Sequence, residues 1–187
     1  MFIVKNRTKH LLCNALMTLL IEQKRSFESI TINEICERAI IHRTTFYTHF
    51  ADKYALFQYF YRSITEKRKT YSLAERIYEP FRISTELKQV DLLRIATDLT
   101  FNSNSMRSFI EPLINEALAL DIQKIQQVKN LIIPEQLLIS HLRSTLLTVD
   151  FYWMQQASHL NATQIDDYYQ QLIAPLLGLP KSLLRAW

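Results

Sequence analysis

The chain has 187 residues, of which 48% are hydrophobic and 21% charged, a balance typical of a folded globular protein. It contains one glycine, Gly178, which disfavours β-sandwiches, tight hairpins and the glycine-rich loops that hold phosphates. The net charge of +4 is uneven: residues 1–69 carry 12 Lys and Arg against 6 Asp and Glu, and residues 70–187 carry 10 against 12. A basic first third suits a polyanionic partner.

The composition also bears on location. No stretch approaches the roughly 18 uninterrupted apolar residues that a membrane-spanning helix needs, and the first residues lack the apolar region of a signal peptide. Cys13 and Cys36 lie in apolar helical patterns without CxxC spacing, so we expect free, buried thiols in a reducing compartment. These patterns predict a cytoplasmic protein without membrane contact.

The first third of the chain shows four helical segments. Apolar residues at helical spacing predict a first helix over residues 6–23. Thr31 and Glu34 have the spacing of a capping box, which predicts a short helix from Thr31 to about Arg38. A second short helix should begin at His42 or Arg43, and residues 52–69 should form a long helix capped by Asp52.

The remainder is again helical by pattern. Residues 71–84 are interrupted by Pro80 and are predicted to form a loop or broken turn, and residues 86–101 are periodic. Further breaks predict a short helix ending at Phe109, followed by helices over about 112–128, 134–157 and 162–178. We therefore predict an all-α fold of about nine helices. An N-terminal helix-turn-helix head (1–51), linked through helix 52–69, would precede a C-terminal ligand-binding and dimerisation body (70–187).

The sequence gives little support for an enzyme. The five histidines show no metal-ligand spacing, and neither cysteine has a base partner visible in the sequence. There is no G-x-S-x-G motif. We expect no catalytic residue, no metal site and no cofactor.

The stretch from Thr31 to Lys53 has the pattern of a helix-turn-helix. In such a motif the second helix enters the major groove and its outward side chains contact base edges. The expected base-reading residues are His42, Arg43, Thr44 and Thr45, since Arg pairs with guanine and Thr offers a hydroxyl or contacts a thymine methyl.

Phosphate contacts are expected around that helix, at Thr31, Tyr47, His49 and Lys53. Free backbone amides at a helix start already attract anions, which favours Thr31 and Lys53. The plainer alternative is that the aromatic residues here belong to the core. We accept it for Phe46 and Phe50, whereas Tyr47 has a polar end that a basic flank would direct towards phosphate.

Residues 8–58 resemble the tetracycline-repressor (TetR/AcrR-like) family of bacterial transcription regulators. The resemblance rests on Thr31-Ile32, Ile35-Cys36, Ala39, Arg43-Thr-Thr-Phe-Tyr47, His49-Phe50 and Lys53 to Leu56. It implies a three-helix DNA-binding head, a variable all-α body and a dimer on double-stranded palindromic DNA. It also implies phosphate contacts at Tyr47, His49 and Lys53 and base contacts at about 42 to 45.

Two positions depart from the family pattern. The family usually has glycine at the turn where this chain has Ile40, and commonly after the first helix, where this chain has Lys24-Arg25-Ser26. Because a β-branched residue disfavours positive φ, we expect a reshaped or strained turn at Ile40.

The resemblance also implies where the body acts. Family members usually dimerise through their last two helices, where the apolar candidates are Leu142, Leu146, Val149, Trp153, Tyr168, Leu172, Leu176 and Leu177. The alternative is that these residues pack within one subunit. Candidates for an effector pocket among the middle helices are Phe60, Tyr71, Phe101, Phe109, Ile114, Phe151 and Tyr152.

Together these features predict a dimeric, DNA-binding transcription regulator, a repressor released by a small apolar or aromatic effector. One alternative keeps the fold but makes the chain a coactivator or adaptor whose body binds a protein. Another is an α-helical enzyme.

Overall fold

The computed structural model describes residues 7–89, 93–97, 104–129 and 131–177. Within these ranges every regular element is helical and no strand occurs, so the predicted all-α class is confirmed. The chain divides into two compact units, Met1–Ser63 and Ile64–Trp187. None of the helices described is long and apolar enough to cross a membrane.

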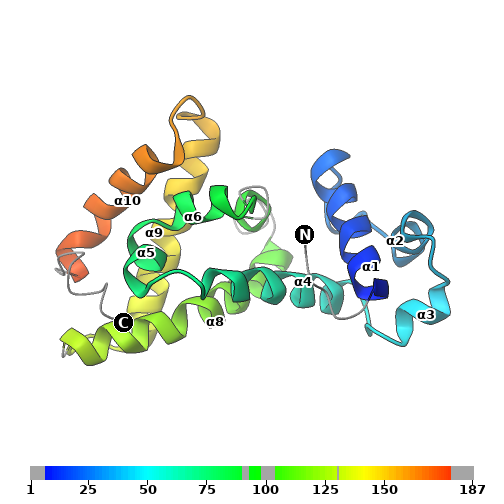
Figure 1. Cartoon of the computed structure of the whole chain (residues 1–187), viewed down its shortest axis with the longest axis horizontal. Coiled ribbons are helices and arrows are strands. Elements are labelled where there is room, and N and C mark those ends of the chain that lie inside the picture. Colours follow the sequence, from blue (N-terminus) through cyan, green and yellow to red (C-terminus); the bar gives the residue numbers. More distant parts are fainter. Residues whose placement is uncertain (1–6, 90–92, 98–103, 130, 178–187) are drawn as a thin grey trace. The chain divides into compact units, whose positions relative to one another are not determined.

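The first unit contains the helix-turn-helix (Figure 1). Helix α1 (Arg7–Met17) continues as a π-helical segment, η1 (Thr18–Glu22), and packs against α2 (Ile32–Ala39). After a turn, α3 (Arg43–Tyr47) packs against α2. Helix α4 (Lys53–Arg68) starts in this unit and runs into the second, so it connects the two covalently.

Both helix starts predicted from local patterns are confirmed. The Thr31 hydroxyl accepts a hydrogen bond from the Glu34 amide at 3.3 Å, and the Glu34 carboxylate accepts from the Thr31 amide at 2.8 Å. The Asp52 carboxylate likewise accepts from the Ala55 amide at 2.7 Å. These bonds satisfy amides that have no partner within the helix.

The core of the first unit draws on every one of its helices. Phe27 packs edge-on against Phe57, with ring centroids 5.5 Å apart. Phe46 and Phe50, assigned to the core from sequence, are buried as expected. Other residues that are at most 1% exposed are Leu12, Leu16, Ile30, Ile35 and Leu56. This core holds α3 on α2 and leaves the opposite side of α3 in solvent.

Three helices end on a residue with positive φ that is not glycine: Lys24 (50°), Ile40 (56°) and Lys88 (55°). At α2 the Ile41 amide donates to the Cys36 carbonyl at 3.0 Å and the Ile40 amide to the Glu37 carbonyl at 3.1 Å. This is the Schellman pattern, which normally places glycine at the left-handed position. The turn therefore keeps its ordinary geometry and is strained at Ile40 rather than reshaped.

The second unit is a helical body. Helices α5 (Leu73–Tyr78) and α6 (Pro80–Glu86) precede a helical stretch at 93–97, and α8 (Asn104–Lys129) packs along α9 (Glu135–Gln155). Helix α10 (Ala162–Leu177) folds back on α9 and packs on α6 (Figure 1). Its core includes Phe81, whose ring meets those of Trp153 and Tyr169 edge-on at 5.8 and 5.9 Å.

The predicted loop at 71–84 is wrong, because this segment forms α5 and α6. The sequence carried the signal: Ser72 and Glu75 form a second capping box, and Pro80 occupies the first turn of α6, where its missing N–H is not needed. The periodic segment predicted at 86–101 is also wrong at its start, since α6 ends at Glu86. Part of that segment lies outside the described residues.

The predicted helix start at Pro112 is wrong as well. Pro112 lies inside the continuous helix α8. A proline there frees the carbonyl four residues earlier, that of Ser108. Both Pro112 and Ser108 are exposed, so water can satisfy the freed carbonyl.

Candidate nucleic-acid interface

Helix α3 presents a row of polar side chains to solvent. His42, Arg43 and Thr44 are exposed, and Thr45 is half-buried. Further along, Tyr47 is 46% exposed, while His49 is half-buried with its ring 6.5 Å from that of Phe50. Because Phe46 anchors the inner side of this five-residue helix, its outer side is free to meet a partner.

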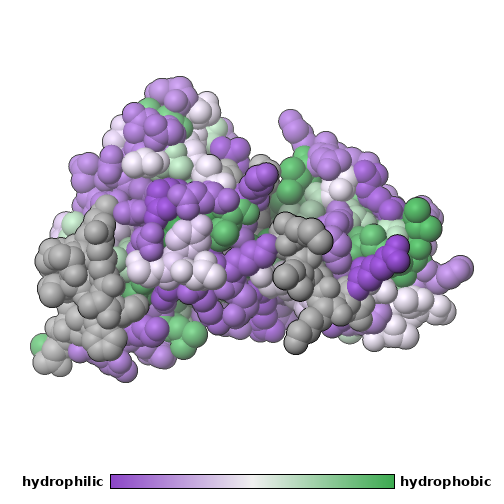
Figure 2. All heavy atoms as spheres, in the orientation of Figure 1, coloured by the Kyte–Doolittle hydropathy of each residue, from purple (hydrophilic) through white to green (hydrophobic). Residues whose placement is uncertain are grey.

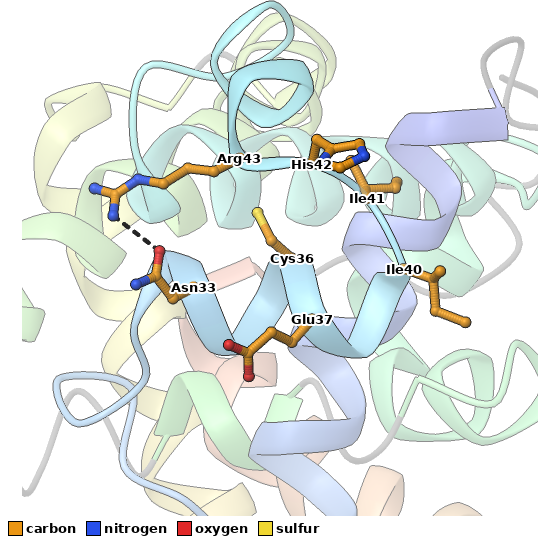
Figure 3. A pocket seen from close by; sticks show the side chains of 7 residues that line it. All are labelled: Asn33, Cys36, Glu37, Ile40, Ile41, His42 and Arg43. Carbon is orange, nitrogen blue, oxygen red and sulfur yellow. Dashed lines mark hydrogen bonds between the residues drawn. The ribbon is translucent and has the colours of Figure 1, made fainter.

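Arg43 is held by two neighbours. Its guanidinium donates to the Asn33 side-chain oxygen at 2.8 Å and to the Tyr47 hydroxyl at 3.1 Å. It also lies 5.6 Å from the centre of the Tyr47 ring. Figure 3 shows the Arg43 side chain directed back towards Asn33 at the start of α2. Asn33 carries no pattern in the sequence that would assign it this role.

An open hollow of about 370 Å³ lies between α2 and the start of α3. Its lining comprises Asn33, Cys36, Glu37, Ile40, Ile41, His42 and Arg43 (Figure 3). Ile40 is 93% exposed, and hydrophobic surface is visible over the α2–α3 region in Figure 2. Cys36 is a free thiol and buried, as predicted, and burial raises its pKa.

Lys53 points into the unit and is fully engaged. Its ammonium donates to the carbonyls of Phe27, Glu28 and Ile30 at 2.8, 2.9 and 2.7 Å. It also lies 5.0 Å from the centre of the Phe27 ring. Desolvation lowers its pKa. Since an ammonium has three donors, Lys53 fastens the loop between α1 and α2 in this structure.

Thr31 is exposed, and both its amide and its hydroxyl bond to Glu34. Glu34 accepts in addition from Arg25 at 2.8 Å. The Arg25 hydrogen bond and the two Thr31 bonds hold the pKa of Glu34 down at about 2. Arg25, which the sequence analysis took only as part of a helix end, thus ties the preceding loop to α2.

The effector-pocket candidates belong to both units and differ in exposure. Phe60 belongs to the first unit and is 9% exposed, and Phe101 lies outside the described residues. In the second unit Ile114 is buried and Phe109 half-buried, while the Tyr71 hydroxyl donates to Glu86 at 3.0 Å. Phe151 and Tyr152 are surface residues, 36% and 40% exposed.

The dimer-interface candidates also differ in exposure. Leu142, Leu146, Val149, Trp153 and Leu177 are buried within the subunit, and Leu176 is half-buried. Tyr168 and Leu172 are 44% and 56% exposed. The Tyr168 ring lies 6.4 Å from that of Tyr152 on α9. Tyr152, Tyr168 and Leu172, which we call the α9–α10 patch, thus form exposed apolar surface across both helices.

The geometry defines a class of protein: an all-helical chain with a helix-turn-helix whose second helix is exposed, the arrangement of a DNA-binding protein. Within the described residues, no three His, Cys, Asp or Glu side chains gather as a metal would require.

Comparison with known proteins agrees with this class. Residues 20–60 match the family described as bacterial regulatory proteins, tetR family. No curated protein sequence matches the chain. A solved structure from Syntrophomonas wolfei, described as a TetR-family transcriptional regulator, is 14% identical with a TM-score of 0.71, over 94% of this chain and 97% of that one.

Two further structures share the fold. One from Rhodococcus sp., also described as a TetR-family transcriptional regulator, is 12% identical with a TM-score of 0.64, over 92% of this chain and all of that one. Thermus thermophilus FadR, a TetR-family repressor solved with lauroyl-CoA, is 17% identical with a TM-score of 0.55, over 88% of this chain and 92% of FadR.

Residues 20–60 carry the helix-turn-helix of the tetR family of bacterial regulatory proteins, and the chain shares the fold of TetR-family structures along most of its length. The resemblance predicted from the sequence is confirmed.

Proposed function

We propose that this chain is a dimeric repressor that binds a palindromic operator and is released by a small molecule. The observation that carries the proposal is the exposed start of α3, where His42, Arg43 and Thr44 stand clear of the core on a tetR-type helix-turn-helix. With half-buried Thr45, these side chains are the proposed readers of base edges in the major groove.

Tyr47 and His49 are the proposed phosphate contacts. Both follow Phe46 in the sequence, and Tyr47 is exposed. Thr31 and Lys53 can join them only by exchanging hydrogen bonds that they already make within the unit. Arg43 must likewise leave Asn33 or carry it along when it meets a base.

The test is the salt dependence of binding to duplexes tiled across the DNA that flanks the gene of this protein. If the head neutralises about six phosphates, affinity for the preferred duplex should fall about 10³-fold between 50 and 200 mM salt. A scrambled duplex of equal length is the control and should bind more weakly at every salt concentration. Binding that is insensitive to salt, or absent from every duplex, contradicts the proposal.

The proposed dimer forms through the α9–α10 patch. Tyr152, Tyr168 and Leu172 are apolar, exposed and adjacent across two packed helices. Scattered single apolar residues are normal on a surface, whereas a contiguous group is typical of an interface. A two-fold axis here would pair each patch with its copy and present two heads to two half-sites of a palindrome.

The proposed release acts through conformers of the dimer. An effector held in the second unit would favour the form whose heads are wrongly spaced for successive major grooves. The shift in population would be set by how much more tightly the effector binds that form than the DNA-binding form. Helix α4 connects the units and would transmit the change. Thermus thermophilus FadR, which shares the fold, was solved with lauroyl-CoA, which supports a small-molecule ligand in this body too.

A further inference from the structure

The interior of the second unit contains polar atoms with no partner. Asp150 on α9 is fully buried, with 0% exposure. One of its carboxylate oxygens accepts from the Thr97 hydroxyl at 2.6 Å, and the other has no hydrogen-bond partner. Two buried donors are also unpaired, the Arg94 Nε and the Gln89 Nε2. These three are the only such side-chain atoms in the part of the chain that the structure describes.

Two of the three belong to one cluster. Arg94 and Thr97 lie one turn apart on the helical stretch 93–97, and Thr97 bonds directly to Asp150. The Arg94 guanidinium lies 5.4 Å from the centre of the Trp153 ring, and Trp153 follows Asp150 by one turn of α9. Burial raises the pKa of Asp150 to about 6, and the Thr97 hydrogen bond and the nearby Arg94 charge act in the opposite direction.

The charges and the unpaired atoms of Asp150 and Arg94 limit the kind of group that could bind between them. A buried carboxylate oxygen without a donor and a buried N–H without an acceptor each lose free energy, so native proteins rarely leave them unpaired. The Asp150 and Arg94 charges are opposite and cancel, so a charged guest would leave one buried charge uncompensated. A neutral group that both donates and accepts would satisfy both atoms at once.

The side chains around Asp150 indicate the character of the rest of the ligand. Trp153 is 6% exposed and belongs to the apolar core of the unit, together with Leu146 and Val149 on the same helix. Leu93, beside Arg94 in the sequence, packs against that core. The rest of a molecule reaching Asp150 would therefore contact aromatic and aliphatic side chains.

We propose that Asp150 and Arg94 form the polar end of the effector site and bind a neutral hydroxyl or carboxamide group on an otherwise apolar ligand. The Asp150 carboxylate accepts from the ligand, and the Arg94 Nε donates to it. This inference rests on the proposed function, in which the second unit holds an effector, and it narrows the effector from any apolar molecule to one with this polar group.

The test uses a set of probes that share a phenyl ring: benzyl alcohol and benzamide, which both donate and accept, toluene, which does neither, and charged benzoate and benzylammonium. Trp153 reports binding by its fluorescence in the full chain carrying Trp187→Phe, because the chain has two tryptophans. Benzyl alcohol and benzamide should bind saturably in the millimolar range. The other three should bind at least ten-fold more weakly.

Matched variants assign the contact. Asp150→Leu should weaken benzyl alcohol and benzamide at least ten-fold, whereas Asp167→Leu, which removes an exposed acid from α10, should leave both unchanged. If Asp150→Leu does not fold, Arg94→Met removes the unpaired donor instead and should give the same loss. Equal binding of all five probes, preference for a charged probe, no saturable binding up to 20 mM, or unchanged binding in these variants overturns the inference.

Failure of this inference is distinguishable from failure of the proposed function. The probe titration needs no DNA, and the salt dependence of DNA binding needs no probe. A chain that binds its operator but no probe refutes the polar site alone, and a chain that binds the probes but no duplex refutes the repressor.

Discussion

At the scale of single residues, Ile40 shows how a chain with almost no glycine still makes its turns. Three helices end on Lys24, Ile40 or Lys88 with positive φ, at positions where glycine is the usual residue. Hydrogen bonds to the preceding turn hold Ile40 in place, and its side chain is 93% exposed. The strain there is local and is not offset by packing of the Ile40 side chain.

Ile40→Gly should therefore stabilise the protein by about 1 kcal/mol, because a β-branched residue in the left-handed region costs about 1–2 kcal/mol and glycine loses part of that gain through its larger unfolded-state entropy. Chemical denaturation followed by circular dichroism measures the change. Ile41→Gly, one residue on and without positive φ, is the control and should destabilise. A neutral or destabilising effect of Ile40→Gly would show that the turn is not strained.

Lys53 was expected from the sequence to contact phosphate, and in the structure it makes hydrogen bonds within the first unit. Its three hydrogen bonds to carbonyls at Phe27, Glu28 and Ile30 make it a fastener of the α1–α2 loop, whether or not it also contacts a phosphate. Arg43, by contrast, is exposed and bonded only to side chains. The two cations should therefore behave differently when removed.

Lys53→Met should lower the free energy of unfolding by about 1–3 kcal/mol, because it leaves carbonyls without a donor. It should also weaken all duplexes alike. Arg43→Ala should change stability by less than about 0.5 kcal/mol, while reducing discrimination between bases by about 1–3 kcal/mol. Denaturation and competition binding separate the two effects. Uniform loss of affinity in both variants, with stability unchanged, would refute this division of roles.

At the scale of elements, α6 depends on a side chain from far along the chain. Pro80 has no N–H, and the amides of Phe81 and Arg82 donate to the two carboxylate oxygens of Asp166, each at 2.9 Å. Asp166 lies on α10 and is 1% exposed. Burial raises its pKa from 3.8 to about 7, although the two amide bonds act in the opposite direction. One acid thus caps α6 and joins it to α10.

This link gives a pH dependence. Because the folded-state pKa of Asp166 is raised, its contribution to stability is fully present below pH 3.8 and is lost as pH rises through about 7. The wild type should therefore be more stable at pH 5 than at pH 8, and Asp166→Asn should reduce that difference. Asp150, whose pKa is raised to about 6, adds in the same direction.

Denaturation at pH 5, 6, 7 and 8 measures this effect, with Asp167→Asn as the exposed control. Asp166→Ala should in addition cost about 2–4 kcal/mol at every pH, since one buried and one partly buried amide lose their acceptor. A wild type equally stable at pH 5 and 8, or an Asp166→Asn variant with the full pH dependence, would contradict the assignment.

At the scale of the whole molecule, the proposed function requires two chains to pair. The α9–α10 patch is part of the exposed apolar surface on the last two helices, and most of the residues expected there from sequence are buried within the subunit instead. A stable dimer needs about 800 Å² from each partner. The patch must therefore be the centre of a wider contact.

Light scattering of the wild type should give twice the chain mass of 22.2 kDa, about 44 kDa. Leu172→Glu places a charge in the patch and should shift the protein to a 22.2 kDa monomer at micromolar concentration. Leu120→Glu, on α8 and 57% exposed, is the matched control and should remain dimeric. A wild-type monomer would exclude this interface, and so would a Leu172→Glu dimer of unchanged affinity.

Sequence alone determined the all-α class, the helix-turn-helix and the family resemblance, because their signals are local. A capping box spans four residues, the aromatic spacing from Phe46 to Phe50 spans five, and helical periodicity is visible in any window of about a dozen. The same kind of signal was present at Ser72 and Glu75, where the effect of Pro80 was overestimated. Pro112 was misjudged likewise, because its exposure cannot be judged from neighbours in sequence.

Only the tertiary structure decided which polar groups are buried and which groups they are hydrogen-bonded to. Lys53 meets carbonyls 23 to 26 residues earlier, Asp150 meets Thr97 53 residues away, and Asp166 caps amides 84 and 85 residues away. Each of these side chains looks in the sequence like any solvated charge on a helix. Their pKa values and hydrogen-bonding needs come from desolvation by distant segments, which is a property of the fold and not of the local sequence.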